Sequence, residues 1–191
     1  MSARIILIRG INVGGKNAVP MAGLRELLAE LGCTDVVTHL ASGNAIVSSE
    51  LARAELSAKI EKALPARFHL DDERVKVLTL TGTAFRSIVD DRPAGFGDEP
   101  TTYHSDAIFL LGIGVSEAMA VFDPREGVDA VWPGDGVIYH QRLSSQRTRS
   151  RLSKIVGTPA YASMTLRSWA TTQKLLALLG PAARYQQPDD P

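Results

Sequence analysis

The passage from an apolar run into a glycine-rich loop near the amino terminus constrains the fold more than any other stretch. Residues 5–8 are all isoleucine or leucine, and such a short apolar run predicts a buried strand. The loop that follows, residues 9–17, contains three glycines, which permit turns with positive φ. Because its backbone amides lie between Arg9 and Lys16, we expect the loop to bind an anion.

This loop narrowly misses the pattern of a nucleotide-binding P-loop. Gly10 to Lys16 has the spacing G-x-x-x-x-G-K, but the next residue is Asn17 rather than serine or threonine. The hydroxyl that ligates Mg²⁺ is absent, and the helix is expected to begin only near Pro20. Two interpretations stay open: a looser cradle for phosphate or carboxylate, and a crossover that only turns the chain. The cradle would be formed by Arg9, Asn12, Gly14, Gly15, Lys16 and Asn17.

Hydrophobic periodicity predicts the order of elements in the first half of the chain. Helical spacing of apolar side chains occurs over residues 20–31 and 52–68. Strand patterns lie at residues 36–40, 45–48 and 75–80. With the opening strand, the order is βαββαβ, which is that of a ferredoxin-like unit with both helices on one face of an antiparallel sheet.

The second half repeats the opening pattern. Residues 108–115 resemble residues 6–13, with a glycine, an isoleucine and a valine in register. Further elements are predicted at residues 83–89, 116–122, 130–132 and 137–139, with a last helix at 166–179 capped by Thr165. We predict an α+β protein of two ferredoxin-like modules, the second incomplete or divergent. Chance similarity between two short βα starts is the alternative to duplication.

Composition predicts where the modules begin and end. Residues 90–104 carry prolines and glycines and are interpreted as a linker. The expected modules are residues 1–89 and residues 105–182, followed by a tail at 183–191. The second module lacks a counterpart of Lys16, so the specific chemistry is expected in the first.

Charge is unevenly distributed although the net charge is zero. Between Gly136 and Pro188 there are eight lysines and arginines and no acidic residue. This asymmetry favours an anionic partner, such as a phosphate-bearing small molecule or a nucleic acid. A solvated basic surface or a contact between subunits would explain it equally well. No apolar run is long enough to span a membrane and no signal sequence is apparent, so we expect a cytoplasmic protein.

Within the basic region, residues 147–154 supply four cations and three hydroxyl groups. This composition suits contacts with phosphate, and the candidate side chains are Arg149, Arg151 and Lys154.

Two other short segments offer candidate ligand contacts. Ser42 and Asn44 could present a hydroxyl and an amide to the ligand of the opening loop, or could only form a turn. Arg167 and Trp169 could meet a flat anionic ligand at the start of the last helix. A place in the hydrophobic core is the alternative for Trp169.

Signals for catalysis are sparse, and whether the protein is an enzyme stays open. The four histidines are dispersed without ligand spacing, so we expect no metal site and no cofactor. No serine lies in a nucleophile elbow. The leading hypothesis is a protein that binds an anionic ligand, a nucleotide or a nucleic acid. The alternatives are an enzyme acting on a phosphorylated or carboxylated small molecule in a cleft between the modules, and an oligomeric interaction module.

The opening motif also resembles a known family. Residues 7–17, with Val19, Pro20, Met21 and Leu24, resemble the signature of the bacterial family called domain of unknown function 1697. The turn at 42–44 is similar to the family's Q-S-G-N segment and residues 165–169 to its T-T-R-N-W segment, with Ala41 in place of Gln and Ser168 in place of Asn. The resemblance implies an α+β protein with ferredoxin-like halves. It implies no cofactor or reaction.

Overall fold

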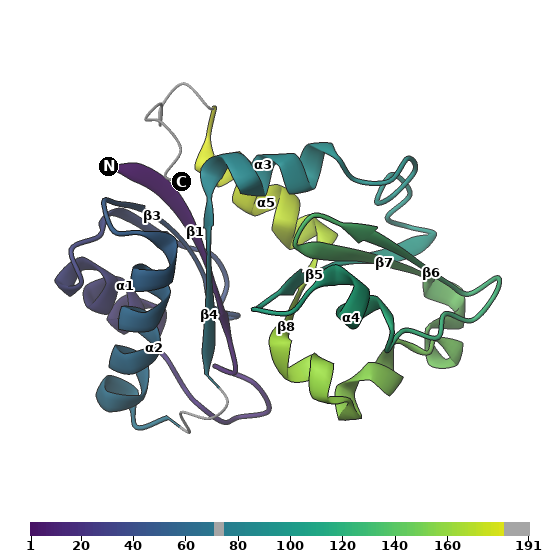
Figure 1. The fold of residues 1–191 in the computed structure, drawn as a ribbon, viewed down its shortest axis with the longest axis horizontal. Helices are drawn as coiled ribbons and strands as arrows, with labels where there is room; N and C mark the ends of the chain where they lie inside the picture. Colours follow the sequence, from purple (N-terminus) through teal and green to yellow (C-terminus); the bar gives the residue numbers. More distant parts are fainter. Residues whose placement is uncertain (71–74, 182–191) are drawn as a thin grey trace. The chain divides into compact units, whose positions relative to one another are not determined.

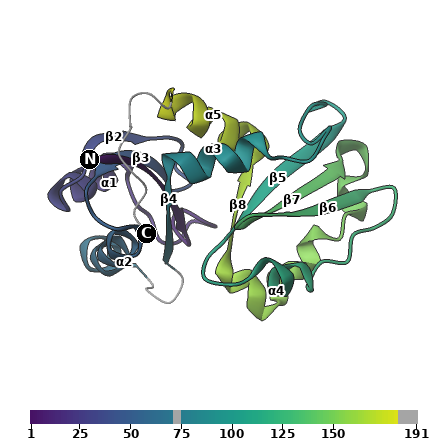
Figure 2. The ribbon, with the colours of Figure 1, turned by 45° about the horizontal axis from the view of Figure 1, so that its top comes forward.

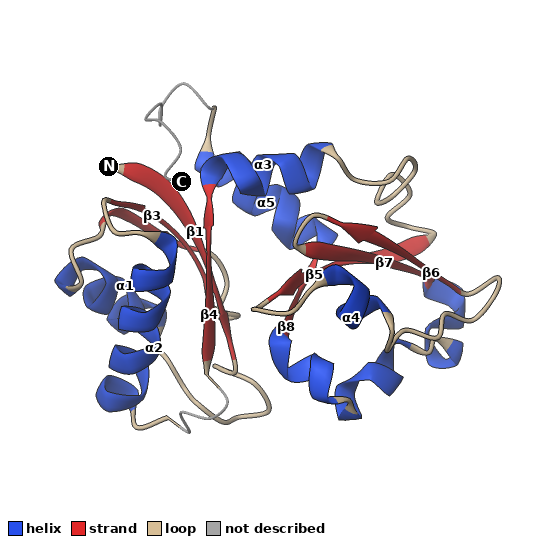
Figure 3. Cartoon of the chain, viewed as in Figure 1, coloured by secondary structure: helices blue, strands red, loops and turns tan. Residues whose placement is uncertain are grey.

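The computed structural model describes residues 1–70 and 75–181 and shows a mixed α+β protein with two four-stranded antiparallel sheets (Figure 1; Figure 3). The chain divides into two compact units. Of the described residues, the first unit comprises those up to residue 86 and residues 175–181, and the second comprises residues 87–174. The boundaries between the units therefore fall inside two helices, α3 (Gly82–Asp90) and α5 (Trp169–Leu179).

The first unit is built around β1 (Ser2–Arg9), which pairs with two neighbouring strands. The order of the sheet is β2-β3-β1-β4. The other elements are α1 (Met21–Glu30), β2 (Thr34–Thr38), β3 (Asn44–Ser49), α2 (Arg53–Phe68) and β4 (Lys76–Thr81). Residues 3–8 are all buried because β1 is covered on both faces and paired at both edges.

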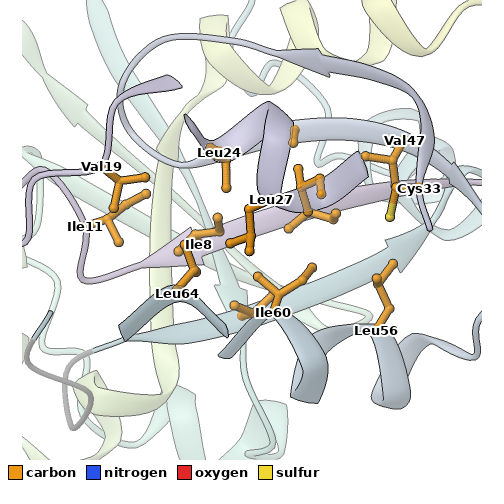
Figure 4. Packing of buried hydrophobic residues seen from close by; sticks show 14 of the residues in the cluster. Ile8, Ile11, Val19, Leu24, Leu27, Cys33, Val47, Leu56, Ile60 and Leu64 are labelled. Carbon is orange, nitrogen blue, oxygen red and sulfur yellow. The ribbon is translucent and has the colours of Figure 1, made fainter. Parts of the chain in front are cut away.

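The core of the first unit lies between this sheet and its helices. Ile8 on β1 packs with Leu24 and Leu27 of α1 and with Ile60 and Leu64 of α2 (Figure 4). Both helices cover the same face of the sheet (Figure 1). Each fully buried leucine or isoleucine stabilises the fold by about 1.5–3 kcal/mol relative to an exposed one, so this cluster is the main source of stability in the unit.

The second unit repeats the strand order with β5 (Tyr103–Leu110) in the middle. Its sheet runs β6-β7-β5-β8, with the strands side by side in Figure 2. The other elements are α4 (Val115–Met119), β6 (Asp129–Gly134), β7 (Val137–Leu143), β8 (Met164–Ser168) and three 3₁₀ segments, η2 (Ser144–Arg149), η3 (Leu152–Gly157) and η4 (Pro159–Ser163).

Alternation along the strands gives the second sheet two different faces. Ile108, Ile138 and Met164 form an apolar cluster with residues of α4 and the 3₁₀ segments. Phe96, Tyr139 and Trp169 form an aromatic group, in which Phe96 lies 5.2 Å from Tyr139 and 5.0 Å from Trp169 between ring centroids. The Tyr139 hydroxyl donates a hydrogen bond to the carbonyl of Ile88 at 2.6 Å.

Most predicted elements are confirmed, but the end of the chain differs. The predicted helix 166–179 was wrong at its start, because residues 164–168 form β8 and the helix begins at Trp169. Residues 164–168 form a strand because they pair with β5, which lies more than fifty residues earlier in the chain. Local periodicity carries no information about such a distant partner. The cap is Ser168 and not Thr165, since the Thr171 amide donates to Ser168 Oγ at 3.2 Å.

The strand β5 begins at Tyr103, before the stretch at 108–115 that resembles residues 6–13, and it ends at Leu110. Pro65 lies inside α2, which continues to Phe68 and ends at His69, whose φ is 54°. A left-handed residue at this position is a common way to end a helix.

We expect Ile60→Ala to lower the free energy of unfolding by about 2–5 kcal/mol, because it leaves a cavity where Ile60 is fully buried. Lys62→Ala, on an exposed position of the same helix, serves as the control and should change it by less than about 0.5 kcal/mol. Urea unfolding followed by circular dichroism measures both. Equal effects would contradict the assignment of this face of α2 to the core.

Candidate functional site

The glycine-rich loop folds back on itself as a miniature hairpin. The backbone amide of Asn12 donates to the carbonyl of Asn17 at 2.9 Å, and the backbone amide of Lys16 donates to the carbonyl of Val13 at 3.0 Å. Gly14 and Gly15 form the turn with φ of 58° and 75°. Two successive positive φ values characterise the type I′ turn, which explains the paired glycines.

The side chain of Asn12 joins this loop to a second loop. Its Nδ2 donates to the carbonyls of Val19 at 3.0 Å and Ala41 at 2.7 Å. Its Oδ1 accepts from the Val19 amide at 2.8 Å. Both amide hydrogens are therefore used inside the protein, although the sequence suggested Asn12 as a ligand contact.

Asn17 also bonds within the loop. Its φ is 51°, a left-handed conformation that asparagine tolerates better than most residues. Its Nδ2 donates to the carbonyl of Gly10 at 2.8 Å. The residue that replaces the P-loop hydroxyl thus closes the base of the loop.

The turn at 42–44 packs against the end of β1. The Ile8 amide donates to the carbonyl of Gly43 at 2.7 Å. A Cβ at Gly43 would stand 2.7 Å from the Ile8 carbonyl oxygen, so only glycine fits. Asn44 is fully buried, and its Nδ2 donates to the His39 carbonyl at 3.0 Å and to Ser42 Oγ at 2.9 Å. Asn44 thus stabilises the turn from inside.

The part of this region that faces solvent is the loop tip, defined here as residues 13–16. Val13 is 68% exposed, and Gly14, Gly15 and Lys16 are exposed as well. Nothing that the structure describes lies within 4 Å of a Cβ built on either glycine. Leu40, on the adjoining turn, is 58% exposed. The loop tip is therefore a projection with a fixed base, whereas Arg9 is half-buried at the end of β1.

Two cations of the basic segment 147–154 are paired with an acid from outside it. Arg151 Nη1 donates to both carboxylate oxygens of Asp123 at 2.8 Å, and Lys154 Nζ lies 3.1 Å from Asp123 Oδ2. The hydrogen bond from Lys154 and the charge of Arg151 lower the pKa of the Asp123 carboxyl. Arg149 is exposed and donates to the Gln146 side chain at 2.8 Å. The local charge is thus lower than the sequence suggests.

Arg167 and Trp169 are buried. Arg167 Nη1 donates to Thr165 Oγ1 at 2.9 Å and to the Leu166 carbonyl at 2.8 Å, and burial lowers the pKa of its guanidinium to about 10. Trp169 is 3% exposed, and a Cβ at Gly97 would overlap its ring. Trp169 therefore belongs to the aromatic core of the second unit.

Sequence reasoning missed a set of titratable residues on three strands of the second sheet, which we call the polar row. It consists of His104 and Asp106 on β5, Asp129 on β6, and His140 and Arg142 on β7. Ring atom Nδ1 of His140 lies 3.8 Å from Asp106 Oδ2, and Nε2 lies 3.5 Å from Asp129 Oδ1. The signal in the sequence is the spacing of two residues between His104 and Asp106 and between His140 and Arg142, which places each pair on one face of a strand. Bringing the pairs together requires the register of the strands.

The carboxylate of Asp129 is held by backbone groups. Its Oδ2 accepts from the amides of Arg125 at 3.2 Å and Arg151 at 2.8 Å. Burial opposes its ionisation, but these amides, the Ser150 hydroxyl and the charge of His140 together hold the pKa of Asp129 below its ordinary value. Asp129 therefore remains a carboxylate in a buried setting.

Comparison with known proteins assigns the chain to a family. A family model described as "Protein of unknown function (DUF1697)" matches residues 1–139. The chain belongs to this family. The matched part includes the loop tip and the turn at 42–44, and it ends before the basic segment and β8. The family expected from the opening motif is confirmed.

The structure of the conserved bacterial protein SP0830 from Streptococcus pneumoniae is similar to this DUF1697 member over both units. The two chains are 26% identical with a TM-score of 0.80, and the similarity covers 93% of this chain and 98% of the other. No curated protein matches the chain. The likeness extends the fold assignment beyond residue 139 to the C-terminal elements.

Among residues 1–70 and 75–181, no three histidine, cysteine or acidic side chains are placed to hold a metal ion. No helix in the described parts of the chain has the length and apolar character needed to cross a membrane.

We expect Asn12→Ala to lower the free energy of unfolding by about 1–3 kcal/mol, because it removes three hydrogen bonds between neighbouring segments. Lys16→Ala on the exposed loop tip should leave stability unchanged. Urea unfolding of both variants tests this. A neutral effect of Asn12→Ala would contradict its structural role.

We also expect the stability difference between the natural protein and Asp129→Asn to depend on pH. The pKa of Asp129 lies below its ordinary 3.8, so its ionisation stabilises the fold fully above that pH, and this contribution is lost as the pH falls through the lower folded value. The urea midpoints should differ most near neutral pH and converge in acid. A constant difference across this range would contradict the assignment.

Proposed function

We propose that this DUF1697 member is a binding protein whose loop tip contacts a phosphate-bearing partner, a nucleotide or a nucleic acid. The observation that carries the proposal is that the base of the loop is fixed by hydrogen bonds while its tip is exposed. Asn12 and Asn17 fix its base through side-chain hydrogen bonds, while residues 13–16 face solvent. Such a preorganised projection loses little conformational entropy when it binds.

Charge supports an anionic partner. Lys16 adds a cation to the loop tip, and Arg9 lies at the base of the same loop. In the second unit, Arg147 and Arg149 are exposed and can add electrostatic attraction. Arg151 and Lys154 would bind phosphate only by giving up Asp123, so we assign them a smaller part.

The shape of the loop tip favours a polymer over an enclosed nucleotide. The space around Gly14 and Gly15 is open, and Val13 is exposed beside them. A projection of this kind touches a phosphate backbone along its surface, whereas small-molecule sites are concave. The favoured partner is therefore a nucleic acid bound mainly through its phosphates.

We infer further that the two units are copies of one ferredoxin-like arrangement, the second divergent. The orders β2-β3-β1-β4 and β6-β7-β5-β8 are equivalent, strand for strand. A glycine with positive φ follows each central strand, Gly10 at 87° and Gly112 at 78°. In the second unit 3₁₀ segments occupy the chain position of α2, and α4 begins at Val115 where the first unit has its loop tip. This supports placing the specific contact in the first unit.

Fluorescence anisotropy with labelled single-stranded RNA and DNA at several salt concentrations tests the binding proposal. We expect affinity to fall steeply with salt because phosphate contacts release counterions. Lys16→Ala should weaken binding several-fold and reduce the salt slope by about one, as expected for the loss of one phosphate contact.

Lys62→Ala is the matched control, because it removes an exposed lysine of α2 in the same unit. It should leave affinity unchanged. Absence of binding at low salt, or equal effects of the two substitutions, would overturn the proposal.

An interaction module is the second candidate, favoured by the exposure of Val13 and Leu40 on adjoining turns. Sedimentation velocity of the natural protein and of a Val13→Ser, Leu40→Ser variant distinguishes it. Self-association that the double substitution abolishes would support this candidate. A monomer at all salt concentrations would count against it.

A further inference from the structure

Leu40 combines a strained backbone with an exposed apolar side chain. Its φ is 57°, a left-handed conformation that is an outlier for a bulky residue. The side chain is 58% exposed, so most of it gains nothing from burial. Asparagine or glycine would adopt this conformation at a lower cost. Because strained residues of this kind cluster at functional sites, Leu40 is a candidate contact residue.

A second exposed aliphatic side chain belongs to the adjoining loop. Val13 is 68% exposed and follows Asn12, whose Nδ2 donates to the carbonyl of Ala41 at 2.7 Å. This hydrogen bond joins the residue before Val13 to the residue after Leu40, so the segments that carry the two side chains are held side by side. We call Val13 and Leu40 the apolar pair.

Exposed cations flank the apolar pair. Lys16 belongs to the loop tip together with Val13. The exposed Arg25 of α1 donates from Nη1 to Thr38 Oγ1 at 2.9 Å, which places its guanidinium at the end of β2, two residues before Leu40. An apolar surface bordered by positive charge is complementary to a partner that carries apolar and anionic groups close together.

The size of the apolar pair favours one small apolar group over a protein surface. A stable protein interface takes about 20–30 residues from each partner. Two aliphatic side chains supply far less, but they are comparable in size with the face of one nucleobase. In a nucleic acid each base lies beside a phosphate, so an apolar face and a negative charge come in the same unit. A nucleotide chain with accessible base faces therefore suits both features.

Base faces are accessible only where bases are unpaired. In a duplex the bases are stacked on one another, and a projecting loop meets phosphates and the edges of the grooves. In a single strand the bases can turn outward and pack against protein side chains. The apolar pair therefore gains contacts with a single strand that a duplex does not offer.

We propose that the apolar pair packs against unpaired bases of a single-stranded nucleic acid whose phosphates contact Lys16 and Arg25. This inference rests on the proposed function and makes it more specific, since it distinguishes a single strand from a duplex. The strain at Leu40 is the cost in stability of placing an apolar side chain at this point of the turn. Because every base has such a face, we expect little sequence preference.

Fluorescence anisotropy with two labelled strands of equal length and charge tests the inference. One strand is oligothymidylate, whose bases stack weakly on one another, and the other is a stable abasic chain with the same number of phosphates. We expect the natural protein to bind oligothymidylate at least about fivefold more tightly at low salt. Lys16→Ala should weaken the binding of both strands by the same factor, because it removes a phosphate contact.

Leu40→Asn is the decisive variant. Asparagine tolerates the left-handed conformation, so the urea midpoint should not fall. The preference for oligothymidylate should be lost, while the affinity for the abasic strand stays unchanged. Val156→Asn is the matched control, because Val156 is an aliphatic side chain of the second unit that is 56% exposed. It should leave both affinities unchanged.

The possible outcomes separate this inference from the function on which it rests. No binding of either strand at low salt would overturn both. Equal binding of the two strands by the natural protein would overturn the inference and leave a phosphate-binding function intact. An unchanged preference in Leu40→Asn would refute the role of Leu40. If that variant also lost self-association in sedimentation velocity, the apolar pair would belong to a contact with a second copy of the chain.

Discussion

The first unit depends on the burial of β1 between β3 and β4. Because both edges of this strand are paired and both faces are covered, its end is a fixed point in the structure. The glycine-rich loop leaves from that point, and the Ile8 amide binds the Gly43 carbonyl there. The position of the loop tip is thus a consequence of strand pairing, and no feature of the loop itself would place it.

Much of the fold could be predicted from periodicity, because β1, α1 and α2 each bury a regular set of apolar side chains. The strand β8 could not be predicted, since five residues with one buried arginine give no decisive hydrophobic pattern and their partner β5 is distant in the sequence. Residues 164–168 show the general limit. Local preference decides only where no long-range partner competes.

The candidate site was only partly predictable. The sequence left open whether the turn at 42–44 lies beside the opening loop or is only a turn, and the hydrogen bond from Asn12 to the Ala41 carbonyl shows that the two segments are neighbours. The structural roles of Asn12 and Asn17 could not be predicted, because an asparagine whose amide closes a loop and one whose amide binds a ligand look alike in a sequence. The polar row was missed since its members come together only through the register of three strands.

The hydrogen bonds of Asn12, Asn17 and Asn44 have a consequence for how relatives of this protein should be compared. These asparagines maintain the loop whatever the loop touches, so shared asparagines report common ancestry of the scaffold and carry no information on a common partner. The side chains at positions 13, 16 and 40 do not hold the loop in place, because they extend into solvent. Subgroups with different partners should therefore separate at these three positions.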